Sequence, residues 1–95
     1  MKVKELKEAS EHLWNEIELS IDVKDRIVEV GYIAVCADKL EIYEFDEYED
    51  DSACLTYKDL KESMSGCLDN AEVTVFTKDG CEVPVREFDN GTFLC

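Results

Sequence analysis

The sequence predicts an α+β protein in which two helices cover one antiparallel sheet. Three observations lead to this prediction: apolar residues at helical spacing in two segments, alternation of apolar and polar residues after each, and a near-repeat of one half of the chain by the other. A length of 95 residues and an apolar share of 45% suit one domain. We expect it to consist of two units, about 1–46 and 55–95, joined by an acidic connector at 47–54.

Each unit is expected to begin with a helix, because apolar residues recur three or four positions apart. They are Val3, Leu6, Leu13 and Ile17 in the first unit and Tyr57, Leu60, Met64 and Cys67 in the second. Trp14 is expected to pack beside the first helix in the core. A half-buried strand should follow each helix, since apolar residues then alternate with polar ones. The inward-facing residues would be Ile17, Leu19, Ile21 and Val23, and in the second unit Ala71, Val73, Val75 and Thr77.

Turns and two more strands should complete each unit. We expect them at 24–26, 27–36, 37–39 and 40–45, and in the second unit at 78–80, 81–88, 89–91 and 92–95. Asp79-Gly80 favours a hairpin with a type I′ turn, in which both central residues have positive φ. Pro84 has no N–H to donate, so the strand that contains it should lie at a sheet edge or break there.

The repeat supports the interpretation that one unit was duplicated. Residues 3–25 align without a gap to residues 57–79, and seven of the 23 pairs are identical. A shared period is the signature of repeated units. Two amphipathic segments of similar composition are the alternative explanation. A unit of about 45 residues buries too little surface to be stable alone, so both units should share one core.

The charge of the chain restricts its partners. Twenty-four Asp and Glu against ten Lys and Arg give a formal net charge of −14. Such a charge opposes direct binding to nucleic acid or to an anionic membrane, because phosphate binding needs Lys and Arg. The expected partners are a cationic protein, a metal ion or the nucleic-acid-binding cleft of another protein, and the alternative is a generic acidic protein whose charge has no specific partner. The first residues lack the apolar region of a signal peptide, and no apolar run is long enough to span a bilayer, so a cytoplasmic location with reduced cysteines is expected.

The sequence contains no catalytic or cofactor motif, so we expect neither an enzyme nor a cofactor. It has no Gly-rich phosphate loop and no nucleophile elbow. The five cysteines form no CxxC pair, which argues against zinc. His12 has Glu8 and Glu16 four residues away on either side, but such a histidine is usually solvated, and no metal site is expected. An enzyme that uses Cys54 or His12 would be the exception.

The segment 41–51, "EIYEFDEYEDD", is the candidate for partner binding. Carboxylates on alternate positions of a strand lie about 6–7 Å apart, which matches the phosphate spacing along one nucleic-acid strand at about 7 Å for successive nucleotides. Aromatic residues between them supply rigid contact area. The alternative is an acidic spacer that prevents an edge strand from pairing with other chains. The candidate residues are Glu41, Tyr43, Glu44, Asp46, Glu47, Tyr48, Glu49, Asp50 and Asp51.

With its small size, acidity and aromatic-rich acidic segment, the chain resembles phage and mobile-element inhibitors, in particular anti-CRISPR proteins that mimic DNA. The resemblance implies a stoichiometric inhibitor that prevents a nuclease complex from reaching DNA. It rests on no specific motif and transfers no site residue. The alternative is a small interaction or assembly module, with a homodimer as one form. In that case binding should survive high salt and depend on apolar surface residues such as Tyr32 and Phe76.

Overall fold

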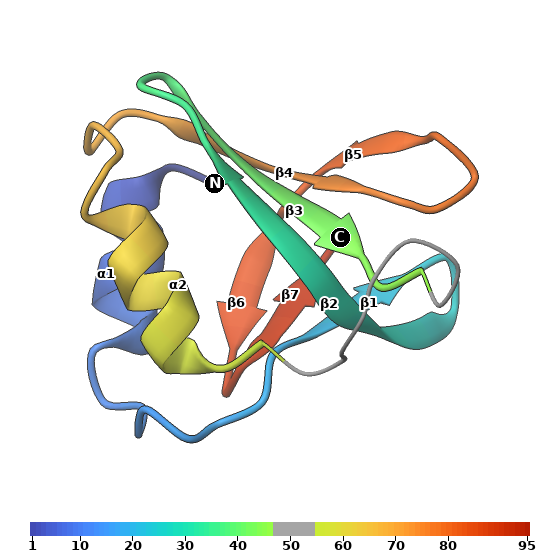
Figure 1. Ribbon diagram of the computed structural model, residues 1–95, viewed down its shortest axis with the longest axis horizontal. Coiled ribbons are helices and arrows are strands. Elements are labelled where there is room, and N and C mark those ends of the chain that lie inside the picture. The colour runs from blue at the N-terminus through green and yellow to red at the C-terminus, as the bar shows by residue number, and fades with distance from the viewer. Residues whose placement is uncertain (47–54) are drawn as a thin grey trace.

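The computed structural model describes residues 1–46 and 55–95, which form two helices and a seven-stranded sheet (Figure 1). The helices are α1 (Val3–Ser10) and α2 (Tyr57–Met64). The strands are β1 (Ser20–Val23), β2 (Arg26–Val35), β3 (Lys39–Glu44), β4 (Glu72–Phe76), β5 (Glu82–Pro84), β6 (Glu87–Asp89) and β7 (Thr92–Leu94). The predicted α+β class is confirmed. The predicted connector, 47–54, lies outside the described residues.

Both helices are shorter than the apolar spacing predicted. In α1, the N–H of Lys2 donates to the carboxylate of Glu5, and the helix ends at Ser10, whose hydroxyl donates to the carbonyl of Leu6 at 2.7 Å. The next turn is closed by a bond from the Leu13 N–H to the Ser10 carbonyl at 2.9 Å. Leu13 therefore reaches the core from a loop and not from the helix.

The expectation that Trp14 packs in the core is wrong. Trp14 lies in the loop after α1 and is 77% exposed, because the chain leaves the helix at Ser10 and turns the indole outward. Leu68, which follows α2 by a similar distance, is 58% exposed. The prediction for Trp14 assumed a helix longer than α1, which ends four residues before it.

The sheet is mixed, which corrects the prediction of an antiparallel sheet. Its order is β5-β4-β3-β2-β1-β7-β6. The pairs β3–β4 and β1–β7 are parallel, and the other neighbours are antiparallel. Parallel strands need a long crossover connection, and α2 lies on the connection from β3 to β4. Alternation of apolar residues specifies which face of a strand is buried but not the direction of its neighbour.

The sheet curls so that its two edge strands are consecutive in the sequence. β5 ends at Pro84 and β6 begins at Glu87. Between them, the N–H of Val85 donates to Val73 of β4 at 3.2 Å, and the N–H of Arg86 donates to Leu94 of β7 at 2.8 Å. The break predicted at the proline is confirmed, and the second half of the chain has four strands where three were expected.

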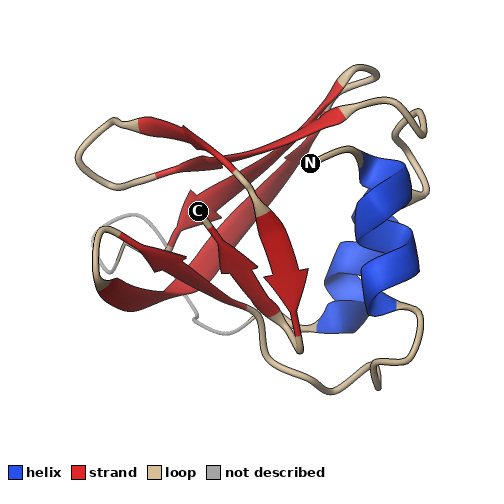
Figure 2. Ribbon diagram, turned by 180° about the vertical axis from the view of Figure 1, so that it is seen from behind, coloured by secondary structure: helices blue, strands red, loops and turns tan. Residues whose placement is uncertain are grey.

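One hydrophobic core joins the sheet to both helices, which lie side by side on one side of it (Figure 2). The inward-facing strand residues are buried as the alternation predicted, with Ile17 as the partly buried exception. The largest fully buried side chain is that of Phe93 in β7. Other fully buried core residues are Val3, Leu6, Leu19, Ile21, Val30, Leu40, Ile42, Leu60, Val73, Val75 and Val85.

Left-handed backbone conformations occur at three turns. Lys24 and Asp25, between β1 and β2, have φ of 51° and 62°, and Asn90 and Gly91, between β6 and β7, have φ of 47° and 95°. Both pairs meet the type I′ requirement for positive φ. The third turn follows β4, where Gly80 has a φ of 92°. The predicted hairpin is present there, but its type I′ turn is not, because Asp79 does not have positive φ; instead the Gly80 N–H donates to the Thr77 carbonyl at 3.0 Å in a longer loop.

Candidate functional site

Three aromatic side chains form a row across β2, β3 and β4. Tyr43 of β3 pairs in register with Tyr32 on one side and with Phe76 on the other. The ring centroids of Tyr32 and Tyr43 are 5.9 Å apart, and those of Tyr43 and Phe76 are 5.0 Å apart with their planes 15° from parallel. The adjacent residues Ile42 and Val75 face the core, so alternation directs this aromatic row to the outer face of the sheet.

A hollow of about 430 Å³ adjoins the aromatic row. Tyr32 is 58% exposed beside it, and the burial of Tyr43 and Phe76 is intermediate. Burial and the nearby Glu41 carboxylate raise the pKa of the Tyr43 hydroxyl, which donates to Glu41 at 3.4 Å. The hollow therefore combines an aromatic wall with a polar one. Its lining residues are Tyr32, Tyr43, Glu44, Asp46, Phe76, Thr77 and Lys78.

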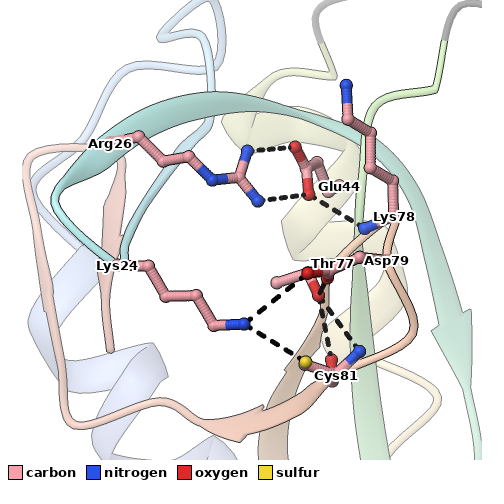
Figure 3. Close-up of polar contacts among 7 residues, drawn as sticks. All are labelled: Lys24, Arg26, Glu44, Thr77, Lys78, Asp79 and Cys81. Atoms are coloured by element: carbon pink, nitrogen blue, oxygen red, sulfur yellow. Dashed lines mark hydrogen bonds and ion pairs between the residues drawn. The ribbon is translucent and has the colours of Figure 1, made fainter.

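A partly buried ion pair supports the polar wall. The side chain of Glu44 is only 2% exposed and receives two bonds from the Arg26 guanidinium, at 2.5 and 3.0 Å (Figure 3). The backbone N–H of Lys78 donates a third bond to this carboxylate at 2.9 Å. The Arg26 guanidinium lowers the pKa of Glu44, with help from the Lys78 N–H and against the effect of burial. Glu44 thereby joins β3 to β2 and to the loop after β4.

A second polar cluster occupies the same loop. The Lys24 ammonium contacts the Cys81 thiol at 3.2 Å and the Asp79 carboxylate at 3.7 Å (Figure 3). The Thr77 hydroxyl donates to Asp79 and is the first cause of the lowered pKa of that carboxyl, and Lys24 adds to the effect. These contacts hold the turn after β1 against the turn after β4. They give the loop a fixed position beside the hollow.

The structure separates the predicted binding residues into three groups. Glu41, Tyr43 and Asp46 lie at the aromatic row or at the hollow beside it. Glu44 lines the hollow, but its carboxylate is engaged by Arg26 and by the backbone of Lys78. Partner binding would need an exposed carboxylate, whereas the carboxylate of Glu44 is bonded within the chain. The remaining predicted residues, Glu47, Tyr48, Glu49, Asp50 and Asp51, lie outside the described residues.

The members of the aromatic row belong to different predictions from the sequence. Tyr43 lies in the acidic segment that is expected to bind a partner, whereas Tyr32 and Phe76 are the apolar surface residues expected of an assembly module. Their common location depends on the parallel pairing of β3 with β4, which brings Tyr43 and Phe76 into register. Alternation alone would have found that each faces outward. No sequence signal specified the strand order that makes them neighbours.

The candidates for chemistry lie apart from this site. The His12 imidazole contacts the side-chain oxygen of Asn90 at 3.4 Å. Glu16 lies beyond the end of α1, so the predicted i±4 arrangement with His12 on one helix does not form. Within residues 1–46 and 55–95, no group of three or more His, Cys, Asp or Glu side chains is placed to hold a metal ion. Cys54 lies outside the described residues.

Comparisons with protein families, with curated proteins and with solved structures give no match to this chain. Among the helices that the structure describes, neither has the length and apolar character needed to cross a membrane. The features of the chain that bear on its function are its charge and the geometry of the aromatic row and its hollow.

Proposed function

We propose that this chain is a non-enzymatic acidic protein that occupies a basic, nucleic-acid-binding surface of another protein. The observation that carries the proposal is the excess of acids, 24 against ten basic residues, together with their concentration in residues 41–51. Asp46 lines the hollow beside the aromatic row and is bonded directly to a segment with four acids among 47–51. A basic surface that binds phosphates would attract such a segment through the same charges.

The most concrete form of this function is inhibition of a CRISPR effector by DNA mimicry. The proposal is supported by the resemblance of the chain to small acidic inhibitors in size, charge and aromatic content. Such a protein would act stoichiometrically, and raising the salt concentration would weaken its binding. Exposed acids would carry the interaction. Glu44 is excluded from this role because its carboxylate is bonded internally.

The test is a plasmid-cleavage assay with a panel of purified CRISPR effectors. The decisive variant reverses the charge of Asp46, Glu47, Glu49 and Asp50 and leaves Glu44 unchanged. We expect the parent chain to inhibit at least one effector, more weakly as salt rises, and the variant to lose inhibition. Inhibition that survives this charge reversal would contradict the proposal. A control with the same change in net charge reverses four acids outside the segment 41–51, the exposed residues Glu8, Glu11, Glu62 and Glu87.

A second candidate function is assembly through an apolar surface. Val35 of β2 is 45% exposed, and a hollow of about 390 Å³ lies between β2 and α2, next to Ile33 and Leu55. Burial of these side chains against another chain would be insensitive to salt. Analytical ultracentrifugation at low and high salt separates the two functions. A dimer that persists in high salt and is lost with Val35→Asp would favour assembly.

The fold supports a further proposal, that the chain arose by internal duplication at an offset of 54 residues. α1 and α2 each have eight residues and begin at Val3 and Tyr57. Their first N–H groups make equivalent bonds to the other half: Val3 to the Ala71 carbonyl at 2.9 Å and Tyr57 to the Ile17 carbonyl at 2.8 Å. The two donor residues, at positions 3 and 57, are 54 positions apart, and so are the two acceptor residues, at positions 17 and 71.

Side-chain contacts repeat at the same offset. The Lys7 ammonium contacts Asp69 at 3.1 Å, and the Lys61 ammonium contacts Asn15 at 3.0 Å. On this proposal, β5 and β6 together correspond to β2, divided at Pro84. Replacing residues 57–79 by residues 3–25 should leave a chain that unfolds cooperatively with a similar circular dichroism spectrum. Loss of cooperative unfolding would count against the duplication.

A further inference from the structure

Two sets of three adjacent strands in the sheet have the same pairing pattern but different outer faces. In β2–β3–β4, the middle strand is antiparallel to one neighbour and parallel to the other, and β6–β7–β1 repeats that pattern. Ile42 pairs with Ile33 and Val75, just as Phe93 pairs with Phe88 and Ile21. One position further along, the row on the outer face is Tyr32, Tyr43 and Phe76 in the first set of strands and Glu87, Leu94 and Asp22 in the second.

This comparison serves as an internal control for the aromatic row. The second row has one aliphatic and two acidic side chains, and its strands still pair in the same pattern. Three aromatic residues are therefore not a requirement of this sheet geometry. Tyr32 leaves 58% of its surface exposed, so much of its apolar surface gains nothing from burial in the isolated chain. Enrichment of aromatic residues is a property of binding surfaces.

We propose that the aromatic row and its hollow form a receptor for arginine side chains of the basic partner, an inference that rests on the proposed function. The Arg guanidinium is planar and weakly hydrated and stacks on aromatic faces, whereas the Lys ammonium is compact and strongly hydrated. A chain of net charge −14 favours a cation at this surface and opposes a nucleic acid, whose bases could also stack on these rings.

The polar wall of the hollow fits the same ligand. Glu44 is not available to this ligand, because its carboxylate is already bonded by Arg26 and by the Lys78 N–H. Glu41 and Asp46 supply carboxylates near the rings. Lys78 also lines the hollow and offsets one of these charges. Selectivity for Arg over Lys must therefore come from the rings, because net charge treats the two side chains alike.

The experiment measures binding of fluorescently labelled octa-arginine and octa-lysine peptides by anisotropy, in low salt. We expect the parent chain to bind both peptides and to prefer octa-arginine by about three- to tenfold, the size of one or two stacking contacts. Tyr43→Leu replaces the central ring of the aromatic row with leucine, the residue found at the equivalent position, Leu94, of the other row. Phe76→Leu removes a second ring. Each should reduce the preference to less than twofold and leave octa-lysine binding within about twofold of the parent.

Trp14→Ala is the matched control, because Trp14 is an exposed aromatic residue outside the row. It should keep the full preference for octa-arginine. Tyr43→Phe keeps the ring and should keep the preference too, so it controls for any loss of folding in Tyr43→Leu. Circular dichroism and thermal unfolding report whether each variant is folded.

The outcomes separate this inference from the proposed function. Failure of both peptides to bind would overturn both. Equal binding of the two peptides by the parent chain would overturn the arginine receptor and leave the acidic function standing. An oligo-dT probe tests the alternative ligand: binding that Tyr43→Leu abolishes would identify the aromatic row as a base-stacking surface and overturn the inference.

Discussion

The ion pair between Glu44 and Arg26 gives the clearest stability prediction. Glu44→Gln keeps the volume of the side chain but removes its charge and replaces one acceptor oxygen with an amide donor. The Glu44 carboxylate, 2% exposed, accepts bonds from Arg26 at 2.5 and 3.0 Å and from the Lys78 N–H at 2.9 Å. At least one of these donors would face the new NH₂ group and lose its partner.

The magnitude follows from the number and exposure of these bonds. A hydrogen bond to a charged group contributes about 1.5–3 kcal/mol. Since the Arg26 side chain is 37% exposed and can bond to water in the variant, we take the lower part of that range. The free energy of unfolding should fall by about 1.5–2 kcal/mol. In a domain of this size, the melting temperature should fall by about 5–15 °C.

The effect should depend on pH with a defined sign. The pKa of Glu44 is lowered in the folded protein, so its contribution is complete above the unfolded pKa and is lost as pH falls through the folded pKa. Urea unfolding should show the full gap between parent and Glu44→Gln near pH 7 and a narrower gap below about pH 4. Glu8→Gln, an exposed acid on α1, is the control. A gap that stays constant with pH, or an equal loss in Glu8→Gln, would refute this account.

Three further substitutions test other parts of the structure by thermal unfolding. Gly91→Ala and Gly80→Ala both place a side chain at positive φ, but the new Cβ at Gly91 would lie 2.8 Å from Ile17, whereas Gly80 has open space. Gly91→Ala should therefore cost at least about 1 kcal/mol more, and equal losses would contradict the packing described. Phe93→Ala should cost about 3–5 kcal/mol because the ring is fully buried, and a loss below about 1 kcal/mol would place it outside the core. Trp14→Ala should change the free energy of unfolding by less than about 0.5 kcal/mol, because Trp14 is exposed, and a large decrease would indicate that Trp14 packs in the core.

Local patterns in the sequence predicted local features correctly. Alternation identified the buried apolar residues of β1 and β4 but not the buried Thr74, and the lack of an N–H at Pro84 predicted the break between β5 and β6. The same reasoning extended α1 too far, because Leu13 keeps helical spacing while it reaches the core from a loop. Periodicity records which side chains are buried, and a loop can bury a side chain as well as a helix can.

Contacts between residues far apart in the sequence were harder to predict from the sequence. Pairing between distant strands depends on tertiary packing, so neither parallel pair followed from local pattern. The charge of Glu44 resembled that of its neighbours in the sequence, yet its position on the inner face of β3 made it the buried partner of Arg26. The signal in the sequence that could have predicted this burial is a charged residue at an inward-facing position of an alternating strand. The cation at Arg26 could have been proposed as its partner.

The parallel pairing of β1 with β7 has a consequence for the synthesis of the protein. Ser20 and Thr92 are 72 residues apart in sequence and neighbours in the sheet, and their hydroxyls lie 2.8 Å apart. β1 therefore lacks its second neighbour on the ribosome until residues 92–94 have left the exit tunnel. Up to that point the nascent chain would present an unpaired strand edge, so chaperone binding should be prolonged compared with a sheet of local hairpins.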